Sequence, residues 1–241
     1  MLNPTGVQFG NTSMAYDAPT QQFIQSWWAA YNQAHPSLFN GPLVACHTLR
    51  MHKDGQLDIE WYATTYAHYL LRADSAVGLK PARAIYCSVA LATANGRVVV
   101  CQMAQTTAAP NRLQLPGGNV EVGTGRTLTL ANCAEDACRE LAEEIGIELS
   151  QSELALWRVK VGGKFDDVGL IFKNRSAISE GFVSGAFEKH LTALKNQGVD
   201  SEIASLRFLS GCDEVGEEDC VDYLSDVLDE MTLTIRSEAA L

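Results

Sequence analysis

The chain has 241 residues, of which 46% are hydrophobic and 20% charged, which is the composition of a globular protein and excludes the disordered and membrane-embedded classes. With 18 Lys and Arg against 29 Asp and Glu, the net charge is −11, so the surface repels nucleic-acid backbones and acidic lipids. We expect neither nucleic acid nor a membrane as a partner. A phosphate-handling protein of this charge needs a local site, most simply a divalent cation held between carboxylates and phosphate.

The cysteines predict reduced thiols and a cytoplasmic location. Their number, seven, is odd, and they form no C-x-x-C pair, which argues against a zinc knuckle and a secreted disulfide framework. The segment from Met1 to Tyr16 lacks the basic and apolar regions of a signal peptide, and no 18 apolar residues run without interruption.

The first eighty residues predict an arm followed by a small α+β subdomain. Residues 1–19 are rich in Asn, Thr, Gly, Ser and Pro without periodicity, which indicates a flexible arm. In the subdomain, residues 20–80, apolar side chains at helical spacing and an Asp54-Gly55 turn predict a helix and a hairpin. The expected elements are a helix over 21–34 and strands over 43–51 and 57–63.

Residues 81–241 predict one larger domain in which strands and helices mix without strict β-α-β alternation. This pattern favours an α+β fold or a sandwich around a mixed sheet. The chain closes with an acidic amphipathic segment. The expected strands are 83–91, 97–102, 113–115, 156–161, 168–173 and 203–209, and the expected helices are 134–145, 186–197 and 213–231.

Three carboxylates lie on one face of the helix predicted over 134–145. Glu140, Glu143 and Glu144 stand at i, i+3 and i+4, which 3.6 residues per turn brings together. Such like charges repel one another, so they need open solvent or a counterion such as Mg²⁺ or Mn²⁺. A solvated acidic face is the plainer interpretation of the three glutamates alone.

The glycine-rich segment upstream favours the counterion. Residues 115–123 read Leu-Pro-Gly-Gly-Asn-Val-Glu-Val-Gly, a strand end followed by a loop, and residues 139–147 read Arg-Glu-Leu-Ala-Glu-Glu-Ile-Gly-Ile. Together they resemble the Nudix box, G-x5-E-x7-R-E-U-x-E-E-x-G-U with U a bulky aliphatic residue, whose second half is met at every defined position. The resemblance implies a Nudix α/β/α sandwich with a mixed sheet over residues 81–241.

One feature departs from the family pattern. The family places its glycine 14 positions before the arginine, whereas Gly118 stands 21 positions before Arg139. The seven extra residues fall within 124–133. The family's early glutamate therefore falls on Thr124 or Ala131, neither of which can ligate a metal as a carboxylate does. This leaves the loop geometry and the number of metal ions open, more than catalysis itself.

By position, the resemblance implies a divalent-metal site and a hydrolytic reaction. Glu140, Glu143, Glu144 and the Gly118 carbonyl would hold the metal, and Arg139 would orient the glutamates. The expected reaction is hydrolysis of a nucleoside diphosphate linked to another group, assisted by Mg²⁺ or Mn²⁺.

The identity of the general base stays open at this point. Glu143 and Glu144 are catalytic candidates within the helix, which by itself does not decide between them. Glu202, before the predicted strand 203–209, resembles a downstream glutamate of many family members and is the first candidate outside the box. Asp166 and Asp167 are the second choice, since any base must reach the attacking water.

A narrower resemblance suggests the substrate. Residues 36–42, Arg50 and residues 64–70 are similar to the N-terminal region of a Nudix subgroup that includes hydrolases of UDP-glucose and UDP-galactose. A nucleotide sugar is therefore the expected substrate, split into UMP and a sugar 1-phosphate. Arg50 and Tyr66 are candidate contacts for the base or phosphates, and Arg126 in the inserted loop is a candidate for closing over the diphosphate.

Other substrates and roles remain open from the sequence. ADP-ribose, dinucleoside polyphosphates and nucleoside triphosphates are alternative substrates, and a noncatalytic nucleotide-binding domain is an alternative role. Trp27 and Trp28 either stack on a nucleobase or, as is commoner at helical spacing, pack against a sheet. The amphipathic helices near the two ends of the chain offer surfaces for a homodimer.

Overall fold

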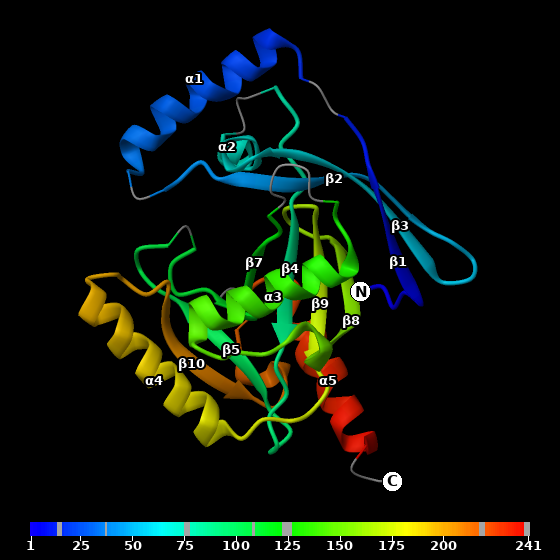
Figure 1. Cartoon of the computed structure of the whole chain (residues 1–241), viewed down its shortest axis with the longest axis vertical. Coiled ribbons are helices and arrows are strands. Elements are labelled where there is room, and N and C mark those ends of the chain that lie inside the picture. Colours follow the sequence, from blue (N-terminus) through cyan, green and yellow to red (C-terminus); the bar gives the residue numbers. More distant parts are fainter. Residues whose placement is uncertain are drawn as a thin grey trace.

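The computed structural model describes residues 1–13, 16–36, 38–74, 78–107, 109–121, 127–216 and 220–238 (Figure 1). Its helices are α1 (Ala18–Ala34), α2 (Tyr66–Leu70), α3 (Leu130–Ile145), α4 (Glu180–Gln197) and α5 (Leu224–Glu238), with 3-10 turns η1 (Leu71–Ala73), η2 (Gln151–Glu153) and η3 (Cys212–Glu214). Its strands are β1 (Gly6–Asn11), β2 (Pro42–Met51), β3 (Gln56–Thr65), β4 (Ile85–Ala90), β5 (Val98–Met103), β6 (Leu113–Gln114), β7 (Gly117–Asn119), β8 (Leu154–Gly162), β9 (Asp167–Asn174) and β10 (Ile203–Leu209).

The predicted α+β class and the layered arrangement are confirmed. The central sheet has the order β7-β4-β9-β8 and is mixed, because β4 and β9 run parallel while the other pairs are antiparallel. Alternate residues of β4 and β9 face opposite sides. One side packs with α3 in the main core and the other with α5 in a second core, so helices cover both faces of this sheet.

The N-terminal part forms its own three-stranded sheet, of order β1-β3-β2, at the top of Figure 1. The predicted hairpin between β2 and β3 is present, and Gly55 has the positive φ of 87° that its turn requires. Strand β1, which lies inside the stretch predicted as an arm, pairs in parallel with β3. The division into an arm (1–19), a subdomain (20–80) and a Nudix domain (81–241) stays a prediction, because the inner face of this sheet shares the main core with α3.

The prediction of one helix over 213–231 is wrong in its first half. The helix α5 begins only at Leu224, and before it the backbone of Cys220 bridges that of Leu113 in a strand-like contact. The Val221 amide donates to the Leu113 carbonyl over 3.0 Å. This pairing requires extended backbone, so a helix cannot continue through it. The apolar stripe of α5 is buried as expected.

Two helices begin earlier than their apolar periodicity predicts. Helix α3 starts at Leu130 and α4 at Glu180, because the side chains of Thr129 and Ser179 cap their first turns by accepting amide hydrogen bonds. The expected end of α3 is confirmed, since Gly146 takes the left-handed conformation with φ 70°.

Further expectations can be compared with the described part of the chain. All seven cysteines are free thiols, as predicted. None of the described helices combines the length and the apolar composition that crossing a membrane requires.

Candidate functional site

The site begins where the β7 glycines meet α3. The apolar face of α3 is anchored by Ala137, Leu141 and Ile145, which are completely buried. This anchoring turns the glutamate face toward Gly117 and Gly118, which pair with β4. The Gly117 amide donates to Glu144 Oε2 over 2.8 Å. A Cβ on Gly118 would lie 2.6 Å from the carboxyl carbon of Glu140, so a side chain here would push the Glu140 carboxylate away from its present position.

Gly117 is required for a different reason. Its φ is 147°, and a Cβ there would come within 2.1 Å of the Cys87 carbonyl oxygen on β4. A side chain would therefore separate β7 from β4 and withdraw the amide that holds Glu144. The close packing against β4 and the hydrogen bond to Glu144 thus explain why glycine stands at this position.

Arg139 joins two of the three glutamates. Its Nη2 donates to Glu140 Oε1 over 2.7 Å, and its Nη1 donates to Glu143 Oε2 over 2.6 Å. The Glu140 side chain is 15% exposed, whereas that of Glu143 is 59% exposed. Of the three glutamates, Glu140 and Glu144 therefore line the buried part of the site, and Glu143 stands at its rim.

Burial dominates the electrostatics of the two inner glutamates. Desolvation raises the pKa of Glu140 to about 7, with Arg139 opposing the rise and Glu143 adding to it. Desolvation likewise raises the pKa of Glu144 to about 8, against the Gly117 amide and together with the charges of Glu140 and Glu202. A cation bound beside these two carboxylates would favour their charged forms.

The donor set fits a hard divalent cation. Within the described residues, no three His, Cys, Asp or Glu side chains converge closely enough to hold a metal ion by themselves. Mg²⁺ commonly takes only one or two carboxylates and fills its remaining positions with water and substrate phosphate. The carboxylates of Glu140 and Glu144 and the neighbouring Gly118 backbone are oxygen donors of the kind that such a cation could take.

Two more carboxylates act on this cluster. Glu202 is exposed, just before β10, and its charge raises both the pKa of Glu144 and that of Tyr66, so the first candidate for an outer base lies near the glutamate face. Glu121, which was not singled out from the sequence, acts on Arg139 and Glu140. Its position three residues after Gly118 was the available signal.

The second choice for the base, Asp166 and Asp167, is engaged elsewhere. Arg72 donates to both carboxylate oxygens of Asp167, over 3.1 and 3.2 Å, and Asp167 is buried. Asp166 pairs with Arg83 at 3.3 Å. Asp167 therefore serves an ion pair that joins the N-terminal part to the β8–β9 turn, and Asp166 serves one that joins this turn to the segment before β4.

The structure separates the predicted substrate contacts. Tyr66 opens α2, is half-buried and stacks on Tyr69 with a centroid distance of 5.5 Å. Arg50 is exposed and lies opposite Asp58 in the β2–β3 ladder, seven strand residues or roughly 23 Å from the Tyr66 end. The two residues are not brought together, and Arg126 lies outside the described residues.

Trp27, Trp28 and His68 take part in packing and hydrogen bonds within the N-terminal part. Trp27 stacks on Tyr31 at 4.7 Å, and both Trp27 and Trp28 pack against a small core that includes α2. The tryptophans therefore pack, as one alternative expected, but against the region of α2 rather than against a sheet. His68 is buried, with Tyr16, Thr64 and the Lys80 carbonyl around its ring.

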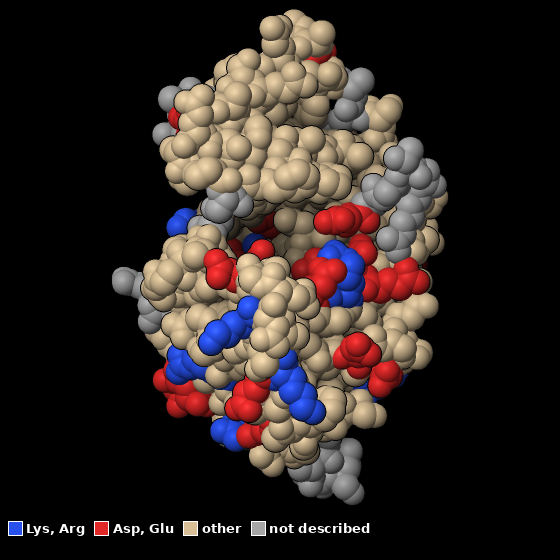
Figure 2. Space-filling model, turned by 60° about the vertical axis from the view of Figure 1, so that its left-hand side comes forward, with Lys and Arg blue, Asp and Glu red and all other residues tan. Residues whose placement is uncertain are grey.

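The surface is hollowed between the N-terminal part and the larger domain. Figure 2 shows this hollow below the almost uncharged upper part of the molecule, with Asp, Glu, Lys and Arg side chains gathered around it. Asp17 is the only Asp, Glu, Lys or Arg among residues 1–49, which agrees with the few charged side chains on the upper part in this view.

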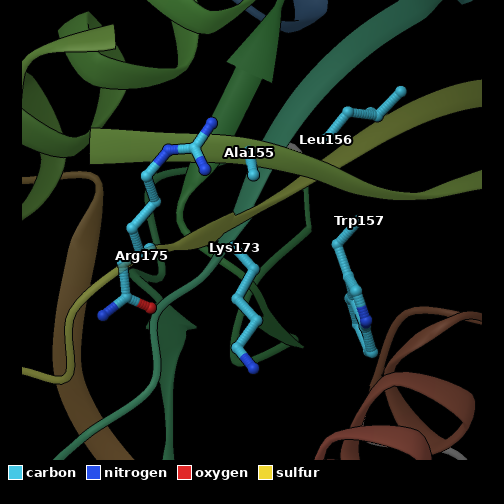
Figure 3. A pocket seen from close by; sticks show the side chains of 6 residues that line it. Ala155, Leu156, Trp157, Lys173 and Arg175 are labelled. Carbon is cyan, nitrogen blue, oxygen red and sulfur yellow. The ribbon is translucent and has the colours of Figure 1, made fainter. Parts of the chain in front are cut away.

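A second, shallow hollow of about 260 Å³ lies at the other end of β9 (Figure 3). The side chain of Asn174, which lines this hollow, is already hydrogen-bonded within the protein. Its carboxamide accepts from the Ala92 amide and donates to the Ala92 carbonyl. It lies roughly 23 Å along β9 from Asp167 and contains no carboxylate. Its lining residues are Ala155, Leu156, Trp157, Lys173, Asn174 and Arg175.

Comparison with known proteins finds similarity to solved structures but none to a family model or a curated sequence. No protein-family model matches the chain, and no curated protein matches its sequence. Several solved structures are similar to it. The MutT protein from Methanosarcina mazei is 14% identical with a TM-score of 0.40, over 63% of this chain and 94% of that protein.

Two further solved structures show the same range of similarity. DR0079 from Deinococcus radiodurans is 16% identical with a TM-score of 0.41, over 79% of this chain and 99% of that protein. A bifunctional NMN adenylyltransferase/ADP ribose pyrophosphatase from Francisella tularensis is 12% identical with a TM-score of 0.39, over 68% of this chain and 44% of that protein. The chain is similar to MutT and Nudix proteins. At TM-scores below 0.5 this similarity carries nothing about activity, so the roles of the residues depend on their own geometry.

Proposed function

We propose that the chain is a Nudix pyrophosphohydrolase that uses a divalent metal, Mg²⁺ or Mn²⁺, to split a nucleoside diphosphate from the group to which it is linked. The observation that supports this most directly is the contact of Gly117 and Gly118 with Glu144 and Glu140. This contact joins the two segments that resemble the Nudix box, residues 115–123 and 139–147. A solvated acidic helix face has no need of such a contact.

Each residue of the cluster has a role in this proposal. Glu140, Glu144 and the Gly118 carbonyl would hold the cation, with Glu143 joining from the rim, and Arg139 would keep the glutamates oriented through its two hydrogen bonds. When bound, the cation would neutralise the pyrophosphate and promote attack by water. Glu202 would accept the proton of the attacking water, since it is exposed and close enough for its charge to act on Glu144.

The proposed substrate is a nucleotide sugar such as UDP-glucose. The support comes from the N-terminal motifs and from Tyr66, whose pKa is raised chiefly by burial and further by the charges of Tyr31 and Glu202. ADP-ribose, dinucleoside polyphosphates and nucleoside triphosphates are the alternatives. The protein would act in the cytoplasm on this small molecule, without nucleic acid or membrane as partner, and a homodimer is the proposed assembly.

A substrate panel tests the function. Phosphate release, after coupled phosphatase treatment, would be measured for UDP-glucose, UDP-galactose, ADP-ribose, diadenosine polyphosphates and nucleoside triphosphates with Mg²⁺ or Mn²⁺. The Glu140→Gln variant should lose turnover. Glu148→Gln, which changes an exposed glutamate just beyond α3, is the matched control and should keep it.

The outcomes separate the alternatives. Turnover of UDP-sugars that is lost only in Glu140→Gln would support both the reaction and the substrate. Turnover of another member of the panel would keep the reaction and overturn the nucleotide-sugar assignment. Nucleotide binding without any turnover would overturn the hydrolase and leave the noncatalytic role.

A further inference from the structure

Three cations surround the ring of Phe165 in the β8–β9 turn. The guanidinium carbons of Arg72 and Arg112 lie 5.2 and 5.7 Å from the ring centroid, and Lys164 Nζ lies at 5.4 Å. Arg72 is neutralised by Asp167. Within the described part of the chain, neither Arg112 nor Lys164 has a carboxylate partner for its side chain.

Two unneutralised cations at one ring are costly in this arrangement. Arg112 and Lys164 repel each other, and contact with an aromatic face returns only about 0.5–1 kcal/mol at exposed sites. The chain carries 29 acidic residues, so carboxylates to neutralise the pair are not scarce. Among the described residues no carboxylate fills this place, so an anionic ligand would stabilise the pair.

The backbone that carries these cations is held firmly. The Lys164 amide donates to Asp222 Oδ2 over 2.9 Å, and the Phe165 carbonyl accepts from Arg72 Nη1 over 3.1 Å. On the other side, the Arg112 carbonyl accepts from the Met103 amide over 2.9 Å. Both cations thus project from fixed main chain, as a preorganised binding site requires.

The cluster is connected to the glutamate face by two routes. Strand β6 follows Arg112 and leads directly to Gly117, five residues later, which is at most roughly 16 Å. A row of aromatic and cationic groups gives the second route. It runs from Tyr66, on whose pKa the charge of Glu202 acts, through Tyr69 and Arg72 to Phe165.

We propose that Arg112 and Lys164, together with the Phe165 ring, form an anion subsite that binds a phosphate group of the nucleotide substrate. The subsite rests on the proposed function for the identity of its ligand. It lets an acidic protein attract an anionic substrate toward a face that already carries several carboxylates. Arg112 and Lys164 are binding residues, so they govern affinity rather than the chemical step.

Binding of UDP to the metal-free protein tests the subsite directly. With EDTA present, the glutamates can only repel UDP, so affinity measured by calorimetry reports on the cations. Arg112→Gln and Lys164→Gln should each weaken UDP binding about tenfold, the size of a lost charge-assisted contact. Uridine, which lacks phosphate, should bind all variants alike, and Lys189→Gln, an exposed lysine of α4, should match the wild type.

Two controls keep the test decisive. Arg112→Lys retains a charge and should recover part of the affinity, whereas a merely misfolded Arg112→Gln protein would show a changed melting temperature and changed uridine binding. Equal UDP affinity in the wild type and both glutamine variants would overturn the subsite. So would a metal-free wild type that does not bind UDP.

Hydrolysis is measured separately, so that the two proposals can fail independently. If no substrate is hydrolysed but UDP binding still depends on Arg112 and Lys164, the proposed function fails and the subsite stands. If UDP-sugars are hydrolysed and both glutamine variants keep the wild-type KM and UDP affinity, the subsite fails and the function stands. A raised KM with unchanged kcat supports both.

Discussion

Two arginines organise the charged groups of this protein in opposite ways. Arg139 bonds to Glu140 and Glu143, its neighbours on one helix. Arg72 bonds to Asp167, which lies 95 residues away, and to the carbonyls of Phe165, Ala82 and Tyr69. The Arg72 side chain is 13% exposed and that of Arg139 is 36% exposed.

The difference lies in the balance of charge. Arg72 and Asp167 neutralise each other, and nearly all donors of the guanidinium have an acceptor, so this pair locks two parts of the chain together. Arg139 faces more carboxylates than it can neutralise, and burial leaves the pKa of Glu144 raised to about 8. Removing one member of the locked pair would leave the other charge buried and unpaired, whereas the cluster at Arg139 holds like charges together at a cost in stability, as functional sites often do.

Breaking the locked pair should have the largest effect. Arg72→Ala leaves the Asp167 carboxylate buried without its partner, which typically costs 3–5 kcal/mol of unfolding free energy. Urea unfolding followed by circular dichroism would measure the loss. The Arg72→Ala/Asp167→Ala double variant should be less destabilised than Arg72→Ala alone, and a loss below about 1 kcal/mol in the single variant would refute the lock.

Neutralising the unbalanced cluster should affect activity instead. Glu144→Gln keeps the acceptor for the Gly117 amide and removes a buried charge, so its unfolding free energy should equal or exceed that of the wild type. Turnover with Mg²⁺ should fall by about 100-fold or more, as for other groups that stabilise transition-state charge. If Glu144→Gln were destabilised and yet kept full turnover, Glu144 would serve stability rather than activity, which contradicts this prediction.

The cap of α3 offers an intermediate effect. Thr129→Ala removes the side chain that accepts from the Asn132 amide over 3.1 Å, which should lower the unfolding free energy by about 1 kcal/mol. The box glutamates lie at least two turns further along the helix, so kcat should change little. Thr192→Ala on the exposed side of α4 is the control, expected within about 0.5 kcal/mol of the wild type.

The smallest expected effect is a pH dependence of the unfolding free energy that comes from His68 in the N-terminal part. Burial lowers the pKa of His68 below its usual 6.5, only partly offset by the bond to the Lys80 carbonyl. The folded protein therefore binds this proton less readily than the unfolded chain, so His68 contributes stability above pH 6.5 that is lost as the pH falls. Unfolding free energies of wild type and His68→Gln across this range should converge toward acidic pH, and parallel curves would contradict the assignment.

The sequence predicted the local features well, because their causes are local. The spacing of Glu140, Glu143 and Glu144 requires one helix face, Gly146 ends that helix, and Gly55 turns a hairpin, each through interactions spanning a few residues. Strand β1 was missed for the opposite reason. Its residues have little periodicity of their own, and only the β3 edge, some fifty residues later, makes them a strand.

The sequence by itself determined the α+β class, most of the elements and the residues of the glutamate helix, because helix and turn chemistry depends on neighbours along the chain. The tertiary structure alone decided that Glu144 accepts from Gly117, that Asp167 belongs to Arg72, that Arg50 lies far from Tyr66, and that Arg112 and Lys164 meet at Phe165. Such contacts depend on how sheets and turns from distant segments pack. No local pattern specifies that packing, because hydrophobic burial, which drives it, is non-directional.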